Sequence, residues 1–250
     1  MTIVLQTQAL RKDFGALTVT DNVDFVLERG ARHALIGPNG AGKTTFINLL
    51  TGDVKPSSGV ILLSGQRIDD LRTDQRIKRG MVRTFQINRL LTGLAVLENV
   101  QLAILEREGL GSRMWLSRGS QRRAAEEAYA LLSELGLADV ALSLVSALPY
   151  GRQRLVEVVI ALALKPKVLL LDEPAAGVPP ADSSRMLDMI EALPADIAVL
   201  IIEHDMKLVF RFAERITVLS QGAILCEGTA QDILDDARVQ AVYLGAPKHG

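Results

Sequence analysis

Apolar residues follow two different spacings along this 250-residue chain, and the change between them divides the sequence into regions. Residues 3–14 and 18–27 place apolar and β-branched side chains at near-alternate positions, which predicts two strands of an antiparallel layer. Residues 168–171 and 197–202 are uninterrupted apolar runs, typical of strands that are buried on both faces of a parallel sheet. The chain therefore combines an antiparallel layer with a parallel sheet.

Helical spacing dominates residues 94–147, where apolar side chains recur three or four positions apart and no strand pattern interrupts them. The other expected elements are strands at 31–36, 60–63, 82–85, 216–219 and 223–227, helices at 69–78, 151–164, 183–193 and 206–213, and two short helices that close the chain. Strands that alternate with helices predict an α/β fold. We expect one domain over residues 1–250, with a core of residues 1–93 and 166–250 and a helical subdomain over about 94–165.

Composition narrows the possible environments and partners. Apolar residues make up 48% of the chain, enough for a large core, and the net charge of −1 gives no general attraction to nucleic acid. The single cysteine, Cys226, excludes an internal disulfide and fits a reducing compartment. The N-terminus does not have the pattern of a secretion signal, and the longest apolar run, residues 155–164, is too short to cross a membrane. We therefore expect any work at a membrane to depend on a partner.

Residues 37–44 read Gly-Pro-Asn-Gly-Ala-Gly-Lys-Thr between an apolar run and a predicted helix, which is the context of a phosphate-binding loop. Glycines let the backbone turn its N–H groups toward phosphate oxygens, and the following helix adds its positive end. We expect Lys43 to reach the β- and γ-phosphates and Thr44 to be a ligand of Mg²⁺. A purely structural glycine turn is the alternative. The expected nucleotide-binding residues here are Gly37, Pro38, Asn39, Gly40, Ala41, Gly42, Lys43, Thr44 and Thr45.

Two carboxylates, Asp172 and Glu173, follow the apolar run at 168–171, at the strand end where open α/β sheets bind ligands. Asp172 is placed to hold Mg²⁺ through its water shell, and Glu173 to polarise a water for attack on the γ-phosphate. By themselves these two residues are equally typical of a strand that ends in solvent. Together with the loop at 37–44 they indicate a nucleotide-hydrolysing site.

Residues 148–154, Leu-Pro-Tyr-Gly-Arg-Gln-Arg, resemble the signature motif of the ATP-binding-cassette (ABC) ATPases. Three further residues resemble family elements in the family's order: Phe14 the aromatic that stacks on adenine, Gln86 the glutamine of the Q-loop, and His204 the histidine that contacts the γ-phosphate. The matching positions extend over nearly the whole chain. The resemblance implies the ABC ATPase fold, a P-loop NTPase with a parallel sheet core, an antiparallel β layer and a helical subdomain.

The resemblance also implies a head-to-tail dimer with ATP and Mg²⁺ as cofactors. Each ATP would lie between the phosphate loop of one subunit and Pro149, Tyr150, Gly151 and Arg152 of the other. A glycine at this turn admits the γ-phosphate, and the helix after it directs its N-terminus at that anion. Glu173, His204 and Gln86 would act in catalysis. The expected metal ligands are Thr44, Gln86 and Asp172.

Three positions depart from the family pattern. Pro149 replaces the usual signature serine and Pro179 replaces an aspartate common after the strand that carries Glu173. We predict slower hydrolysis or weaker dimer closure than in a member that follows the pattern. Arg152 stands where glutamine is usual, and either supplies a cation to phosphate or is a solvated arginine at a helix start.

Residues 83–90, 93–100, 148–151, 172–177 and 241–245 resemble the ATPase subunits of branched-chain or hydrophobic amino-acid importers. Of the two ATPase subunits of such systems the chain resembles the longer, which carries a basic stretch matched by the arginines of residues 113–123. That stretch is either a solvated loop or a contact with lipid head groups or the membrane subunit.

The implied partners are membrane-spanning permease subunits, a second ABC ATPase in a homo- or heterodimer, and a periplasmic or extracellular solute-binding protein, with no nucleic acid. The implied location is cytoplasmic, peripheral on the inner face of the membrane. Alternatives are an importer of urea, amides or aromatic acids, or a soluble ABC ATPase that acts on DNA or ribosomes. A kinase would leave Gln86, His204 and residues 148–154 without a purpose.

Overall fold

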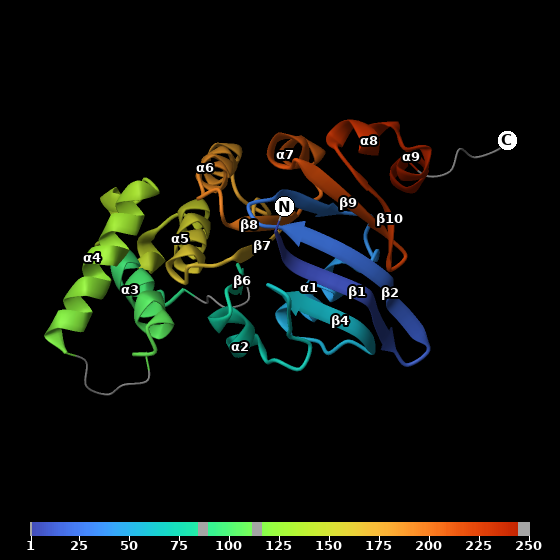
Figure 1. Ribbon diagram of the computed structural model, residues 1–250. Helices are drawn as coiled ribbons and strands as arrows, with labels where there is room; N and C mark the ends of the chain where they lie inside the picture. The colour runs from blue at the N-terminus through green and yellow to red at the C-terminus, as the bar shows by residue number, and fades with distance from the viewer. Residues whose placement is uncertain (1, 85–89, 112–116, 245–250) are drawn as a thin grey trace. The chain divides into compact units, whose positions relative to one another are not determined.

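The computed structural model describes residues 2–84, 90–111 and 117–244 (Figure 1). The chain forms two compact units. The first unit contains residues 1–81, 167–173 and 194–250, and the second contains residues 82–166 and 174–193. Chain segments far apart in the sequence therefore build each unit, and each is described by itself.

The first unit contains two sheets. Its four-stranded antiparallel sheet has the order β2-β1-β4-β5, and the six-stranded sheet has the order β10-β9-β3-β8-β7-β6, with β6 (Met81–Arg83) at the unit boundary. Strands β9, β3, β8 and β7 are parallel, and β10 is an antiparallel edge. The bounds are β1 (Ile3–Phe14), β2 (Leu17–Glu28), β3 (Arg32–Ile36), β4 (Ser58–Leu63), β5 (Gln66–Arg67), β7 (Val168–Asp172), β8 (Ala198–Ile202), β9 (Arg215–Ser220) and β10 (Ala223–Gly228).

The core of the first unit contains apolar side chains of both sheets and of α1 (Lys43–Thr51). Phe25 of β2 meets Phe46 of α1 edge to face, with ring centroids 5.6 Å apart. The other helices of this unit are α2 (Thr73–Lys78), α7 (Met206–Phe212), α8 (Ala230–Asp235) and α9 (Ala237–Leu244). Helix α1 is thus held inside the core, which fixes the loop that precedes it.

A buried arginine closes the far end of α1. Arg76 is 1% exposed, and its Nη1 donates to the carbonyl oxygens of Leu49 and Leu50, each at 2.6 Å. Its Nη2 donates to the carbonyl of Asp69 at 2.9 Å. A cation at a helix C-terminus satisfies carbonyls that lack intrahelical partners and opposes the negative end of the helix dipole.

The expected helix over residues 69–78 is too long by one turn. Helix α2 begins at Thr73, because Asp69 is committed to the neighbouring hairpin. Its buried carboxylate accepts the amide of Ile61 at 2.7 Å and pairs with Arg67. The side chain of Asp69 thus holds residues 69–72 outside the helix.

The second unit is helical, with α3 (Val96–Arg107), α4 (Arg118–Glu134), α5 (Tyr150–Ala163), α6 (Pro180–Glu191) and two short 3₁₀ turns, η1 (Ala138–Val140) and η2 (Val145–Ala147). Arg107 joins three of these helices: its guanidinium donates to Glu127 of α4 at 2.8 and 3.0 Å and to the carbonyl of Ala163 in α5 at 2.7 Å. The hydrogen bond from Arg107 lowers the pKa of Glu127 to about 2. Within the described ranges, no helix has both the length and the apolar character that a membrane crossing requires.

The unit boundaries differ from the expected subdomain boundaries. The second unit begins at residue 82 rather than near 94, and it includes residues 174–193, which were expected in the core. The reason is a close contact between two helices. A Cβ atom on Gly151 of α5 would lie 2.3 Å from Oδ2 of Asp182 in α6, so the two helices approach closely and pack as a pair.

Candidate functional site

The phosphate loop of residues 37–42 joins β3 to α1 and is held by backbone on two sides. Gly40 and Gly42 have φ angles of 79° and 98°, in the left-handed region that favours glycine. A Cβ on Gly42 would lie 2.5 Å from the Val19 oxygen, and one on Gly37 would lie 2.3 Å from the Leu219 oxygen. The glycines are therefore required both for the turn and for the close approach of β2 and β9.

Lys43, the first residue of α1, folds its side chain back over this loop. Its Nζ donates to the carbonyl oxygens of Gly37 at 2.6 Å and Pro38 at 3.1 Å. Burial lowers the pKa of Lys43, while the charges of Glu173 and Asp172 raise it. The ammonium group is therefore held against the loop carbonyls, within electrostatic reach of Asp172 and Glu173.

The N-terminus of α1 is not capped by a side chain. Gly42 at the N-cap has no side chain to accept a hydrogen bond, and the first turn contains no acidic residue. Thr44 is exposed and Thr45 is half-buried. Amides at an uncapped helix N-terminus, together with the helix dipole, favour an anion. This end of α1 is therefore suited to phosphate.

Asp172 and Glu173 lie at the carboxyl end of β7, at the same edge of the sheet as the phosphate loop. Asp172 pairs with Ile202 of β8, and Ile202 pairs with Leu35 of β3. With strands about 4.8 Å apart, Asp172 lies roughly 10 Å across the sheet from the start of the loop. The carboxylate and the loop therefore lie two strands apart at one edge of the sheet.

Glu173 adopts an unusual backbone conformation. Its φ angle is 46°, in the left-handed region, and its N–H donates to the carbonyl of Ile202 at 2.9 Å. For a residue with a side chain, this conformation costs about 1–3 kcal/mol and persists only where the surroundings impose it. The side chain of Glu173 is 50% exposed.

His204 lies after β8 and before Asp205, whose carboxylate caps α7 by accepting the amide of Lys207 at 2.9 Å. The Nδ1 atom of His204 is 3.9 Å from Oε1 of Glu173 and 3.9 Å from Oε2 of Glu203. The imidazole is largely exposed, whereas Glu203 is buried. The structure therefore places Lys43, Asp172, Glu173 and His204 at one edge of the sheet.

The signature turn lies in the second unit, where Pro149 is the N-cap residue of α5 and has no side-chain hydrogen bond. The Arg154 guanidinium lies 4.7 Å from the Tyr150 ring centroid, and its Nε donates to the Tyr150 hydroxyl at 2.7 Å. A Cβ on Gly177 would lie 3.6 Å from Cε1 of Tyr150. Tyr150 thus packs against the segment that follows Glu173 in the chain.

Arg152 forms an ion pair with Asp139. Its Nη1 lies 2.5 Å from Oδ2 of Asp139, and this hydrogen bond lowers the pKa of the Asp139 carboxyl. The structure shows neither of the two arrangements expected for Arg152. The guanidinium is neither solvated on all sides nor unpaired, and any contact with phosphate requires it to exchange Asp139 for the anion.

Phe14, the expected adenine platform, is the last residue of β1 and is 50% exposed. Gln86 falls in residues 85–89 and lies outside the described residues, as do residues 113–116 of the basic stretch. Of the described part, Arg122 pairs with Glu126 within α4, and both side chains are exposed. For the basic stretch of residues 113–123, a solvated surface and a contact with a partner both stay predictions.

Three contacts of the site residues were not predicted from the sequence: those of Lys12 with Phe14, Asp139 with Arg152, and Glu203 with His204. The first had a signal, because a lysine two positions before an aromatic on a strand lies on the same face. Glu203 is adjacent to His204 but follows an apolar strand, where an acidic residue is normally exposed. His33, for which we expected no role, is buried in β3 with its Nε2 2.8 Å from the Thr217 hydroxyl.

Comparison with known proteins adds independent findings. A family model described as "ABC transporter" matches residues 20–176. The branched-chain amino acid transport ATP-binding protein BraF of Pseudomonas aeruginosa is 37% identical over 97% of this chain and 98% of its own length. The corresponding protein LivG of Escherichia coli is 39% identical, again over 97% and 98% of the two chains.

Solved structures of ABC transporter cassettes are also similar to this chain. The chain superposes on the ADP conformation of MJ1267, an ATP-binding cassette of an ABC transporter, with a TM-score of 0.87 and 30% identity. That match covers 98% of this chain and all of the other. A nucleotide-free cassette of an ABC transporter gives a TM-score of 0.85, also at 30% identity and over 97% of this chain and 99% of the other.

Proposed function

The chain belongs to the ABC transporter family as an ATPase with the ABC fold, and on that premise we propose that it powers an importer of branched-chain or other amino acids. The observation that carries the proposal is the end-to-end similarity to two branched-chain amino acid transport ATP-binding proteins. It is supported by the site in the first unit, where an ammonium group, two carboxylates and an imidazole meet beside a phosphate loop.

Each residue of that site has a proposed role in ATP hydrolysis. The loop amides and Lys43 bind the phosphates, and Lys43 exchanges the carbonyls of Gly37 and Pro38 for phosphate oxygens. Glu173 accepts a proton from the attacking water, and His204, placed 3.9 Å from Glu173, contacts the γ-phosphate. The Thr44 hydroxyl and the Asp172 carboxylate are hard oxygen donors of the kind that Mg²⁺ prefers, and they would hold it with Gln86.

The second unit completes the site of another cassette. The uncapped turn at Pro149 and the N-terminus of α5 would approach the γ-phosphate bound to a second ATPase subunit, identical or related. ATP binding would close the dimer of ATPase subunits, and ATP hydrolysis would allow the two subunits to separate again. Dimeric cassettes are known for a structure that is 24% identical to this chain and shares its fold.

Transport requires further partners. Membrane-spanning permease subunits would dock on this chain and hold it at the inner, cytoplasmic face of the membrane. Gln86 would couple the nucleotide to that docking surface, and a solute-binding protein outside the membrane would deliver the amino acid. The net charge of −1 supports a function without nucleic acid.

The decisive test is solute uptake in the source cell. Deletion of the coding sequence should abolish high-affinity uptake of radiolabelled leucine, isoleucine and valine. The wild-type chain should restore it, and the Glu173→Gln variant, expressed to the same level, should not. Purified chain should hydrolyse ATP, and Glu173→Gln should bind ATP without turnover.

The deletion strain could take up branched-chain amino acids normally but lose uptake of urea, amides or aromatic acids. In that case the transported solute is a different one, and the proposed transport function is retained. If uptake of all these solutes is normal, and the chain co-purifies with ribosomes or DNA instead of permeases, the transport proposal is wrong.

A further inference from the structure

The end of the β1–β2 hairpin contains contacts that the proposed hydrolysis does not use. The Nζ atom of Lys12 lies 4.9 Å from the centroid of the Phe14 ring. The same Nζ donates a hydrogen bond to the carbonyl of Lys55 at 2.9 Å. One face of the phenyl ring is therefore covered by an ammonium group that is itself held in place, and the exposed surface of Phe14 is left for a planar ligand.

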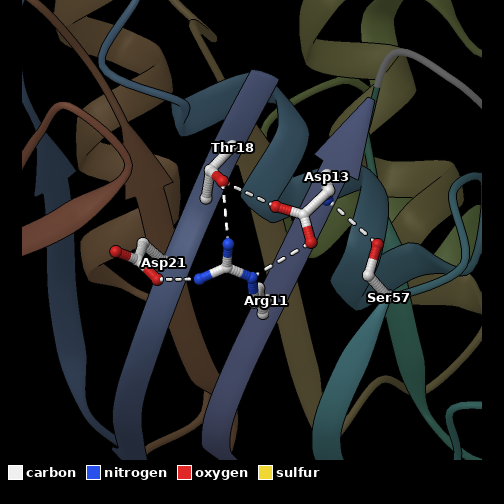
Figure 2. Close-up of polar contacts among 5 residues, drawn as sticks. All are labelled: Arg11, Asp13, Thr18, Asp21 and Ser57. Atoms are coloured by element: carbon white, nitrogen blue, oxygen red, sulfur yellow. Dashed lines mark hydrogen bonds and ion pairs between the residues drawn. The ribbon is translucent and has the colours of Figure 1, made fainter. Parts of the chain in front are cut away.

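A second group fixes the hairpin on which Phe14 stands (Figure 2). The guanidinium of Arg11 donates to Asp13 at 3.0 Å, to Asp21 at 2.6 Å and to the Thr18 hydroxyl at 2.9 Å. The Thr18 hydroxyl donates in turn to the other oxygen of Asp13 at 2.7 Å. This Arg11 cluster, formed by Arg11, Asp13, Thr18 and Asp21, joins β1 to β2 directly beside the turn that follows Phe14.

The pairing register explains why the hairpin needs this cluster. Irregularities in the register of β1 and β2 occur between Leu10 and Lys12 and again between Lys12 and Asp13. Bulges of this kind bend a strand and redirect its side chains. Without a side-chain clamp across the two strands, the last residues of β1 would have few constraints on their orientation.

The hairpin end is also tied to the segment that leaves the phosphate helix. The amide of Asp13 donates to the Ser57 hydroxyl at 3.0 Å (Figure 2). The amide of Ser57 donates to the carbonyl of Arg11 at 2.8 Å. Ser57 and Lys55 lie between α1 and β4. The position of Phe14 is thereby set relative to the helix that opens at the phosphate loop.

We propose that Lys12 and Arg11 are positioning residues for nucleobase recognition: Lys12 holds the Phe14 ring so that its free face stacks on a purine, and Arg11 fixes the hairpin end at the matching distance from the phosphate loop. This inference rests on the proposed ATPase function and on the role expected for Phe14 from the family resemblance, which is stacking on adenine. A cation on one face draws π-electron density toward it, which favours an electron-rich base on the other face. A ring that is already immobilised also loses less freedom on binding.

The test compares two ligands that share phosphates and differ in the base. Dissociation constants of the full-length chain for ATP and for inorganic triphosphate are measured by calorimetry. Lys12→Met keeps the length of the side chain and removes its charge. We expect this variant to bind ATP two- to fivefold more weakly and inorganic triphosphate as well as the wild type does. Lys12→Arg should restore ATP affinity, because a guanidinium also stacks on aromatic rings.

Arg11→Lys should give the same selective loss, because an ammonium group cannot hold three acceptors in one plane. Arg29→Met is the matched control. It removes a cation with one exposed partner, Asp196, just beyond the other end of β2, and should leave both affinities unchanged.

Unchanged ATP affinity in Lys12→Met, or equal weakening of both ligands, would overturn the inference. Phe14→Ala separates this failure from that of the proposed nucleotide site. If Phe14→Ala weakens ATP selectively while Lys12→Met does not, the platform stands and the positioning role is wrong. If Phe14→Ala binds ATP like the wild type, the platform itself is wrong.

Discussion

The phosphate loop and the signature turn are both glycine-containing turns that open a helix, but different contacts hold them. Backbone holds the phosphate loop: the Gly222 amide donates to the Ala41 carbonyl at 3.0 Å, and the oxygens of Val19 and Leu219 pack against its glycines. Side chains surround the signature turn, where Arg152 pairs with Asp139 and Gly151 packs against Asp182.

This difference bears on the three positions that we expect to depart from the family pattern. A loop that is held by backbone contacts depends little on the side chains of its neighbours, but its glycines cannot be substituted because a Cβ atom would collide with that backbone. A turn held by side chains can change its residues as long as the pairs change together. Pro149, Arg152 and Pro179, the three departures, all lie in the second unit. On the proposed function, we therefore expect substitutions to be tolerated less in the phosphate loop than at the turn that would close on a second subunit.

The largest effect should come from Glu173, the proposed general base of the first unit. We expect Glu173→Gln to lower the rate of ATP hydrolysis by about 10²–10⁴-fold, because an amide cannot accept the proton of the attacking water. ATP affinity should remain within a few-fold of the wild type. Single-turnover kinetics and equilibrium binding measure the two quantities. Hydrolysis at near the wild-type rate would show that another residue is the base.

The pH dependence of the free energy of unfolding tests whether His33 is buried as a neutral imidazole in β3, the strand that leads into the phosphate loop. Burial lowers the pKa of His33 to about 4, so the folded state keeps this imidazole neutral, although Glu227 opposes the shift and Arg215 adds to it. Between pH 6.5 and 4 the unfolded chain therefore binds more protons than the folded chain, and the free energy of unfolding falls as the pH is lowered.

The contribution of His33 to this fall is about 3 kcal/mol. Urea unfolding at several pH values should show it as the difference between the wild type and His33→Gln, since the other groups cancel. The His33 contribution is complete above pH 6.5 and levels off below pH 4. A difference that does not change with pH would refute the assignment.

A pair of glycine substitutions tests the packing of the second unit. Gly151→Ala places a Cβ 2.3 Å from Oδ2 of Asp182, and we expect the overpacking to cost about 1–3 kcal/mol of stability. Gly119→Ala in α4 meets only the Ser117 hydroxyl, at 3.9 Å, and should stabilise the helix by up to about 1 kcal/mol. Thermal unfolding compares them. Asp182→Ala should rescue Gly151→Ala, and equal effects of the two glycine variants would disprove the close contact.

The smallest effect concerns the departures at the signature turn. Pro149→Ser restores a hydroxyl and an N–H at the N-cap of α5, and we expect a gain of less than about tenfold in ATPase rate or dimer lifetime. Arg152→Gln releases Asp139 and should add a smaller gain. Steady-state ATPase assays and light scattering of the ATP-bound Glu173→Gln dimer measure these gains. No gain from Pro149→Ser would mean that proline does not limit closure.

Local sequence patterns predicted much of the fold. The apolar runs at 168–171 and 197–202 became β7 and β8 almost to the residue, because a strand buried on both faces has few alternatives. The phosphate loop could be located because its glycines, lysine and threonine are adjacent in the sequence. The comparisons confirm the ABC ATPase fold and the family that these motifs indicated. The roles of the individual site residues stay predictions.

Contacts between distant residues could not be predicted in this way. Helix α2 is shorter than expected because Asp69 bonds to Ile61 in a hairpin that only the folded chain brings near. Residues 174–193 join the second unit because α6 packs on α5, which no periodicity reveals. The pairing of Arg152 with Asp139 likewise depends on how a 3₁₀ turn lies beside a helix.

Arg76 has a consequence for how nucleotide leaves. Helix ends normally fray, and amide hydrogens there exchange with solvent through small local openings. The guanidinium buried against Leu49 and Leu50 removes that freedom at the far end of α1, since any opening would strand a charge in the core. We therefore expect the amides at the C-terminal end of α1 to exchange only through larger openings of this unit. On the proposed function, ADP would then leave without unfolding of the helix behind the phosphate loop.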